Sequence, residues 1–333
     1  MSAPGTHGVV APPRILDEPA VAALLRMEDL VDLMERTLAD FSSGRVLQPV
    51  RTVLPIERHQ SLLAVMPGYL PGSGALAVKV VSVAPGNVAR GLPSHLATIL
   101  LVDPETGALI AIMDGRLITE MRTAAVSAAA ARALARPGAS VLALIGSGVQ
   151  AKSHLEALRL VRPLERVRVW SPTRERREAF ARDAERRFGL AVEAAGSAAE
   201  AVRSADLVVT ATSSHVPVLE GRWLAPGTHV TGVGACRPDQ REVDAETVRR
   251  ASVWVDSAAA ARVEAGDLLL AEREGVPWDA RVRGEIGAVF EGSLPGRRDP
   301  DEITLFESLG LAVEDAATAL HVWRKAEASP PRS

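Results

Sequence analysis

A glycine-containing turn directly after an apolar run is the feature that most constrains how this chain can fold. The run Val141–Ile145 is followed at residues 146–151 by Gly-Ser-Gly-Val-Gln-Ala, and then by an Ala- and Leu-rich segment typical of a helix. In such a unit the first glycine permits a tight turn, the second lets the backbone approach a pyrophosphate, and the small last residue lets helix and strand pack closely. Backbone N–H groups and the positive end of the helix dipole then face the anion. The pattern predicts a dinucleotide site, and a strand–helix turn without a ligand is the alternative.

The pattern of apolar residues differs on the two sides of this turn. Residues 20–41 have helical spacing, and short apolar runs split by Pro and Gly between residues 50 and 112 indicate a mainly antiparallel sheet. An Ala-rich helix is predicted over residues 121–134. Strands and helices then alternate, which predicts an α/β fold with a doubly wound parallel sheet. Strands are expected at residues 141–145, 167–170, 191–193, 207–210, 229–233 and 253–256, and a last helix at 306–326.

Composition limits the class of protein. The 333 residues are enough for about two domains, and the net charge of −3 gives no reason to expect nucleic acid or an anionic membrane as a partner. Cys236 is the only cysteine, so an internal disulfide is impossible and a reducing compartment is expected. No apolar span reaches the ~20 residues of a membrane helix, and the first residues lack the pattern of a signal peptide. We expect a cytoplasmic protein, and no histidine or cysteine spacing suggests a metal.

The end of the second predicted strand bears on the choice of dinucleotide. An NAD-preferring site usually has Asp or Glu about 20 residues beyond the glycines. Here Ser171 and Thr173 are followed by Arg174, with no acid before Glu175. Two hydroxyls and a guanidinium suit a 2′-phosphate, so NADPH is favoured and NADH is the other candidate. Alternatively, these residues only cap the next helix.

Three basic residues occupy positions that structure alone does not favour. Lys79 lies among apolar residues of a predicted strand, and Arg51 stands in another. Arg122 falls near the expected start of the Ala-rich helix, where the dipole disfavours a cation. Buried cations are costly unless they are paired or used. The three suggest a common anionic ligand such as a carboxylate, with ordinary salt bridges or edge positions as the alternative.

These motifs resemble the ornithine cyclodeaminase/mu-crystallin family from about Arg14 to Lys325, and the mu-crystallin branch, which acts as a ketimine reductase, is the most similar. The matching segments are VMPGY at 65–69, KVV at 79–81, LPSH at 92–95, MDG at 113–115, RTAAVS at 122–127, GSGVQA at 146–151, GVGACRP at 232–238 and LFESLG at 305–310.

The resemblance implies a homodimer whose sheet domains join in a closed barrel, with a site in the cleft beside each Rossmann domain. Residues 1–13 are rich in Pro and Gly and are expected to form a loose tail. The resemblance divides the rest into a substrate-binding and dimerisation domain (14–122 with 311–333) and a Rossmann dinucleotide-binding domain (123–310). It implies an oxidoreductase that uses NAD(P)H to reduce a cyclic ketimine carboxylate, Δ1-pyrroline-2-carboxylate or Δ1-piperideine-2-carboxylate, to the cyclic amino acid.

The resemblance also assigns residues. Arg51, Lys79 and Arg122 would hold the substrate carboxylate, with Lys79 as the proton donor, and Met66 and Cys236 would lie beside the substrate. The positions implied for the cofactor are Ser94, His95, Arg122, Thr123, Gly146, Ser147, Gly148, Val149, Gln150, Ser171, Thr173, Arg174, Thr212, Ser213, Val233 and Ser308.

The sequence departs from the family pattern at two places. Cyclodeaminase and alanine dehydrogenase members have an Asp where this chain has Cys236, and a thiol cannot supply the carboxylate that handles an amine or water. The mu-crystallin Asn-Arg-Thr-Arg is Ser-Pro-Thr-Arg at residues 171–174, which removes one arginine. Cys236 therefore argues against the first alternative, an ornithine or lysine cyclodeaminase or an alanine-dehydrogenase-like oxidoreductase. An NADPH-dependent binding protein for a small ligand, without turnover, is the second.

Overall fold

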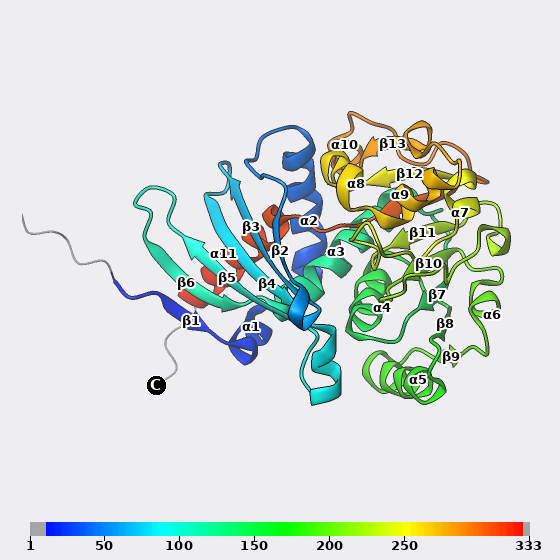
Figure 1. The fold of residues 1–333 in the computed structure, drawn as a ribbon, viewed down its shortest axis with the longest axis horizontal. Coiled ribbons are helices and arrows are strands. Elements are labelled where there is room, and N and C mark those ends of the chain that lie inside the picture. The colour runs from blue at the N-terminus through cyan, green and yellow to red at the C-terminus, as the bar shows by residue number, and fades with distance from the viewer. Residues whose placement is uncertain (1–10, 329–333) are drawn as a thin grey trace, which may run out of the picture.

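Two β-sheets lie on either side of a long helix, α3 (Arg116–Leu134), in the computed structural model (Figure 1). The structure describes residues 11–328, so most of the predicted tail over residues 1–13 lies outside the described residues. Among these residues, no helix combines the length and apolar character needed to cross a bilayer.

The first sheet is mixed and has the order β1-β6-β5-β4-β3-β2. Only β1 and β6 run parallel, and the other neighbouring pairs are antiparallel, which confirms the mainly antiparallel prediction. Along β3 and β4 buried and half-buried residues alternate, because successive side chains point to opposite faces. Its strands are β1 (Arg14–Leu16), β2 (Thr52–Ile56), β3 (Ser61–Leu70), β4 (Ala75–Val83), β5 (His95–Val102) and β6 (Leu109–Asp114).

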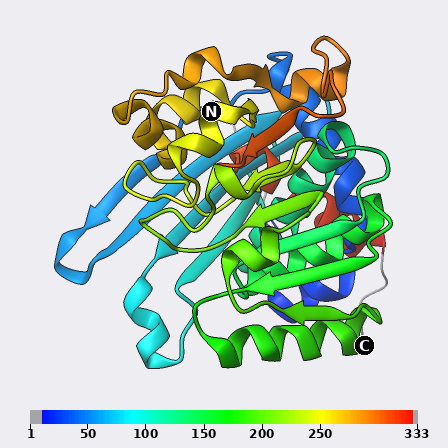
Figure 2. The same cartoon turned by 90° about the vertical axis from the view of Figure 1, so that its right-hand side faces the viewer.

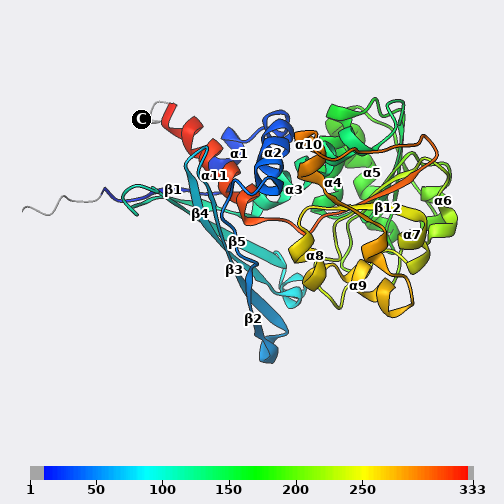
Figure 3. The same cartoon turned by 90° about the horizontal axis from the view of Figure 1, so that it is seen from above.

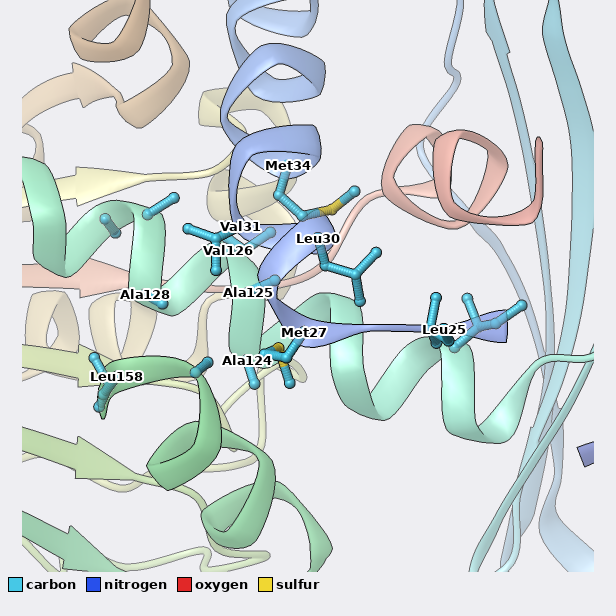
Figure 4. Packing of buried hydrophobic residues seen from close by; sticks show 14 of the residues in the cluster. Leu25, Met27, Leu30, Val31, Met34, Ala124, Ala125, Val126, Ala128 and Leu158 are labelled. Atoms are coloured by element: carbon cyan, nitrogen blue, oxygen red, sulfur yellow. The ribbon is translucent and has the colours of Figure 1, made fainter. Parts of the chain in front are cut away.

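Helices cover one face of this sheet only (Figure 3). They are α1 (Glu18–Leu24), α2 (Met27–Ser42) and α11 (Ala312–Ala328). The apolar residues of α2 recur at helical spacing and pack against the alanines of α3 (Figure 4). Small side chains let the two helices approach closely, so α2 and α3 form the core between the two sheets. The residues labelled in this contact include Met27, Leu30, Val31, Met34, Ala124, Ala125 and Ala128.

The second sheet is parallel throughout, with the order β13-β12-β14-β11-β10-β7-β8-β9 (Figure 2). Strands β10, β11 and β14 are buried along their whole length, as in a sheet with helices on both faces. The order reverses between β7 and β10, where such sheets bind ligands. The strands are β7 (Val141–Ile145), β8 (Arg166–Trp170), β9 (Val192–Ala194), β10 (Leu207–Thr210), β11 (His229–Gly232), β12 (Ala251–Val255), β13 (Val282–Glu285) and β14 (Ile303–Glu307). The helices are α4 (Val149–Val161), α5 (Arg174–Phe188), α6 (Ala198–Val202), α7 (Ala245–Arg250), α8 (Ala258–Glu264), α9 (Gly266–Arg273) and α10 (Ile286–Glu291).

The doubly wound α/β prediction is confirmed, with two corrections. Residues 303–307 form the buried strand β14 between β11 and β12, so the prediction that a helix begins at Phe306 is wrong. The apolar run there fits a fully buried strand, and periodicity alone does not separate the two. Helix α3 begins at Arg116 rather than residue 121, because the Asp114 carboxylate accepts the N–H of Arg116 at 3.0 Å. Arg122 therefore lies in the helix interior, away from the N-terminus.

The glycine turn after β7 gives a stability test with a matched control. Gly146 has φ +120°, and a Cβ there would lie 2.4 Å from the Ala211 carbonyl oxygen, whereas a Cβ on Gly148 would meet no atom within 4 Å. We expect Gly146→Ala to lower the free energy of unfolding by about 2–3 kcal/mol through backbone strain. Gly148→Ala should stay within about 1 kcal/mol of wild type. Urea unfolding measures both, and equal losses would contradict the steric argument.

Candidate active site

A cavity of about 1180 Å³ lies between the two sheets. Strands β2 to β5 and helix α3 line one side, and the segments after β11 and β14 line the other. Its lining includes Gln150, so the cavity extends to the first turn of α4, which follows the glycine turn. The fold thus brings Arg51, Lys79 and Arg122, which are distant in sequence, to the lining of one cavity.

Lys79 is the most deeply buried cation of the cavity, with 2% of its surface exposed. It lies in the middle of β4, and its Nζ is 2.5 Å from Asp315 Oδ2 and donates to Thr119 Oγ1 at 3.4 Å. Burial lowers the pKa of Lys79 to about 8, against the opposing effect of Asp315 and with the help of the positive Arg122. An ammonium with such a pKa can both hold and release a proton near neutral pH.

Arg122 reaches the same carboxylate from α3. Its Nε donates to Asp315 Oδ1 at 3.1 Å and its Nη1 donates to Glu314. Burial opposes the charge of Arg122, but Asp315 and Glu314 outweigh it and raise the pKa of the guanidinium. Gly310 (φ +82°) permits the approach, since a Cβ there would lie 2.7 Å from Arg122 Nη1.

The two carboxyl groups at the start of α11 behave differently. Burial raises the pKa of Glu314 to about 7, although Arg122 lowers it. The pKa of Asp315 falls below its ordinary value, because Arg122 and Lys79 together outweigh burial. At neutral pH Asp315 is ionised and Glu314 is partly protonated, so this group of four residues carries a variable net charge.

Arg51 directly precedes β2 rather than lying in it, and it bridges the cavity to the second side. Its Nη2 donates to the carbonyls of Leu309 (2.9 Å) and Gly310 (2.8 Å) and lies 3.0 Å from Glu264 Oε2. All three predicted cations thus line one cavity, and each has a carboxylate partner within the protein. Their contact with a ligand stays a prediction.

The sequence reasoning missed these partners, Glu264, Glu314 and Asp315. Acids in the first turn of a helix are common because they compensate its dipole, so Glu314 and Asp315 carried no signal of burial. Glu264 is the last residue of α8, and an acidic residue at a helix end likewise gives no signal that it is buried beside a cation. The only cue was the need of Lys79 and Arg122 for counter-charges.

Other predicted site residues separate into two groups. His95 stands at the start of β5, where burial and the nearby Lys79 and Arg122 lower its pKa to about 4, so the imidazole is neutral at pH 7. Ser94 beside it is exposed and does not line the cavity. Burial raises the pKa of the Cys236 thiol, which therefore stays protonated. The predicted residues in the cavity lining are Arg51, Met66, Lys79, His95, Arg122, Thr123, Gln150, Val233, Cys236 and Ser308.

The second group follows the carboxyl ends of the parallel strands, outside the cavity lining. Gly148 precedes α4 beside open space, and no side chain caps the first turn of that helix. Ser147 Oγ donates to Ser171 Oγ at 2.9 Å, which fixes the turn against β8. A helix start without a side-chain cap, and open space beside Gly148, fit the binding of a pyrophosphate by backbone N–H groups. This group comprises Gly146, Ser147, Gly148, Val149, Ser171, Thr173, Arg174, Thr212 and Ser213.

The start of α5 leaves polar groups for a ribose or its phosphate. Thr173 is the N-cap residue, but its side chain makes no capping hydrogen bond. Arg174 is exposed, and its Nε donates to Glu178 Oε1 at 2.6 Å. Thr173 thus makes no capping hydrogen bond that would support the alternative, in which these residues only cap α5.

Comparisons with known proteins agree with this architecture. A family model described as "Ornithine cyclodeaminase/mu-crystallin family" matches residues 13–329. Ketimine reductase mu-crystallin of Mus musculus is 43% identical over 297 residues, 88% of this chain and 91% of its own length. The structure of Thermococcus litoralis Δ1-pyrroline-2-carboxylate reductase with NADH and L-proline has a TM-score of 0.93 at 39% identity, covering 95% of this chain and 98% of that one. An archaeal alanine dehydrogenase dimer with bound NAD has a TM-score of 0.91 at 34% identity, covering 96% and 98%.

The buried ion pairs give a second stability test. Asp315→Asn is expected to lower the free energy of unfolding by about 3–5 kcal/mol, because Lys79 then lies buried without a carboxylate. Asp183→Asn is the control, since the side chains of Lys152 and Asp183 in that pair are 41% and 36% exposed, and the pair should contribute less than about 1 kcal/mol. Urea unfolding at pH 7 compares them, and similar losses in the two variants would contradict the network.

Proposed function

The chain belongs to the ornithine cyclodeaminase/mu-crystallin family, and we propose that it reduces the C=N bond of a cyclic ketimine carboxylate with NAD(P)H. Δ1-Pyrroline-2-carboxylate and Δ1-piperideine-2-carboxylate are the proposed substrates. The observation that carries the proposal is one cavity that holds Arg51, Lys79 and Arg122 and extends to Gln150 in the first turn of α4, after the glycine turn. The similarity of the chain to the mouse ketimine reductase and to the Thermococcus reductase supports it.

The cations would orient the substrate through its carboxylate. Arg122 and Lys79 approach each other through Asp315, and Arg51 lines the same cavity, where it is bonded to the carbonyls of Leu309 and Gly310. Their positive charge is offset by Asp315, Glu264 and, when ionised, Glu314. Because the pKa of Glu314 is about 7, uptake of one proton there leaves a net positive charge for the incoming carboxylate. Fixing the carboxylate holds the C=N carbon in one orientation.

Lys79 is the proposed source of the proton. A bound nicotinamide cofactor supplies the hydride that forms the new C–H bond. Transfer of a proton from Lys79 Nζ to the ring nitrogen makes the iminium, a better electrophile, and forms the N–H bond of the product. The lowered pKa of Lys79 favours that transfer, and Asp315 holds the ammonium in place before it.

NADPH is the proposed cofactor, with NADH as the weaker one. The uncapped hydroxyl of Thr173 and the exposed Arg174 at the start of α5 suit a 2′-phosphate. No acidic residue stands between the end of β8 and Arg174 to accept the hydrogen bond of a free ribose hydroxyl.

Cys236 favours reduction over deamination. Cys236 lines the cavity, and its protonated thiol cannot replace a carboxylate that handles an amine or water. The carboxylate nearby, Glu264, is held by Arg51.

The activity test is the loss of NADPH absorbance with a panel of cyclic ketimines. We expect turnover with both proposed ring sizes or one of them, and a kcat/KM about tenfold lower with NADH, the equivalent of one charged hydrogen bond. Lys79→Met should lower kcat at least about 100-fold. Lys152→Met, a surface lysine of α4, is the control and should retain wild-type turnover.

Other outcomes of this assay point to the alternatives. Release of ammonia from ornithine, lysine or alanine, without ketimine reduction, would establish the deaminating or dehydrogenating function. Tight binding of ligands without any turnover would establish a binding protein. Wild-type turnover in Lys79→Met would remove Lys79 from the proposed mechanism.

We also infer a homodimer formed through the first sheet. No helix covers the face of this sheet opposite α1, α2 and α11 (Figure 3). Half-buried apolar residues lie on it, with Val65 paired to Val80 and Val78 paired to Leu100 across neighbouring strands. Exposed apolar patches of this kind mark interaction sites. The archaeal alanine dehydrogenase, which is a dimer, supports the proposal.

The oligomeric state is tested by light scattering after gel filtration. We expect twice the chain mass of 35.2 kDa for wild type, and a single chain for Val80→Asp, because a carboxylate in an apolar interface is not solvated. Leu160→Asp, an exposed position near the end of α4, should leave the dimer intact. A wild-type protein of single-chain mass would overturn the dimer.

A further inference from the structure

Four carboxyl groups are buried directly behind the second wall of the cavity. Glu242, Asp256 and Asp267 have 0% of their surface exposed, and Glu307 has 1%. None of the four forms an ion pair with any residue between 11 and 328, unlike Asp315 and Glu264. The proposed mechanism does not use them. We call this set the carboxyl cluster.

Only the backbone of residues 232–234 separates part of the carboxyl cluster from the cavity. Glu242 accepts the N–H of Gly234 at 2.6 Å, and a Cβ on Gly232 would lie 2.7 Å from Glu307 Oε2 and 3.7 Å from Asp267 Oδ2. Val233, between the two glycines, lines the cavity. The wall at this point is therefore a single residue thick, because glycines on both sides leave room for the carboxyl groups.

The same relation holds at the segment after β14. Asp256 Oδ2 accepts the N–H groups of Leu309 and Gly310, both at 2.6 Å, and these residues line the cavity with Ser308. Within the described chain, Asp256 Oδ1, Asp267 Oδ2 and Glu307 Oε2 are buried without a hydrogen-bond partner. Buried carboxyl oxygens of this kind are costly, which calls for a physical reason for the cluster.

The two walls of the cavity thus differ in their buried ionisable groups. Lys79 and Arg122 lie on the side of the first sheet, and the carboxyl cluster lies on the side of the parallel sheet. Val233 and Ser308 on the second wall are predicted cofactor contacts. Loss of hydride turns a neutral dihydronicotinamide into a cation, and a carboxylate nearby in a medium of low dielectric stabilises that cation.

We propose that Glu242, Asp267 and Glu307 are electrostatic positioning residues that favour the oxidised, cationic form of the bound cofactor over the reduced form. This inference rests on the proposed function for the place of the cofactor. The residues act through the backbone of 232–234 and touch neither substrate nor cofactor. Their effect is to ease release of the hydride toward the cationic wall.

The charge of the carboxyl cluster depends on pH. Burial raises the pKa of Asp267 to about 8 and of Asp256 to about 6, and that of Glu307 lies well above its ordinary value. The charged groups that face the cluster are Arg241, Arg51, Arg122, Glu314, the Cys236 thiol and the four carboxyl groups themselves. An oxidised cofactor favours the ionised carboxylates, so its binding releases protons and becomes tighter as pH rises.

Binding of NADP⁺ and NADPH to the protein, measured by calorimetry from pH 6 to 9, tests this. We expect the ratio Kd(NADP⁺)/Kd(NADPH) of wild type to fall at least about threefold over this range, since each released proton permits up to tenfold per pH unit. In Glu307→Gln and Asp267→Asn the fall should shrink and the ratio at pH 8 should rise. Glu307→Asp, which keeps the charge, should restore the wild-type trend. Glu246→Gln, a surface acid in α7, is the matched control.

The outcomes separate the inference from the proposed function. Wild type that binds neither form overturns the proposed function and the inference together. Wild type that binds both, with the same ratio and pH trend in Glu307→Gln and Asp267→Asn, overturns the inference alone. Circular dichroism identifies a variant that does not fold, and the other variant then decides.

Discussion

The ion-pair network of Lys79, Arg122, Glu314 and Asp315 is the interaction on which the rest of the structure depends. It joins β4, α3 and α11, and its Arg122–Asp315 bond spans 193 positions of the chain. Removing these charges from water costs several kcal/mol per ion, which is tolerated because each one meets an opposite charge. The network fixes the C-terminal helix against the first sheet and places two cations at the cavity wall.

The cavity exists because two sheets with different construction face each other across α3. The first sheet has helices on one face and contributes side chains, with Lys79 and Met66 projecting from its strands. The second sheet is buried on both faces, so only the carboxyl ends of its strands remain available for ligands. Those ends contribute backbone groups and small residues, as at Gly148 and Val233.

Ionisable groups are separated across the cavity in a way that suits the proposed reaction. Lys79 and Arg122 stand with their carboxylate partners on one wall, and carboxyl groups without ion-pair partners stand behind the other within the described residues. Hydride transfer moves negative charge from cofactor to substrate, so both walls would stabilise the transfer. Burial raises the pKa of Glu307, and the neighbouring carboxyl groups of Asp267, Glu242 and Asp256 raise it further.

The sequence by itself determined the glycine turn at 146–148, the α/β architecture and the three unusual cations, because turn chemistry, periodicity and a charge in an apolar run are local signals. It misassigned Phe306, since a short apolar run suits a buried strand and a helix equally. Only the tertiary structure decided that Asp315 and Glu314 neutralise Lys79 and Arg122, and that Glu307 and Asp267 lie behind Val233. Such pairings join residues far apart in the chain, so packing alone brings them within reach.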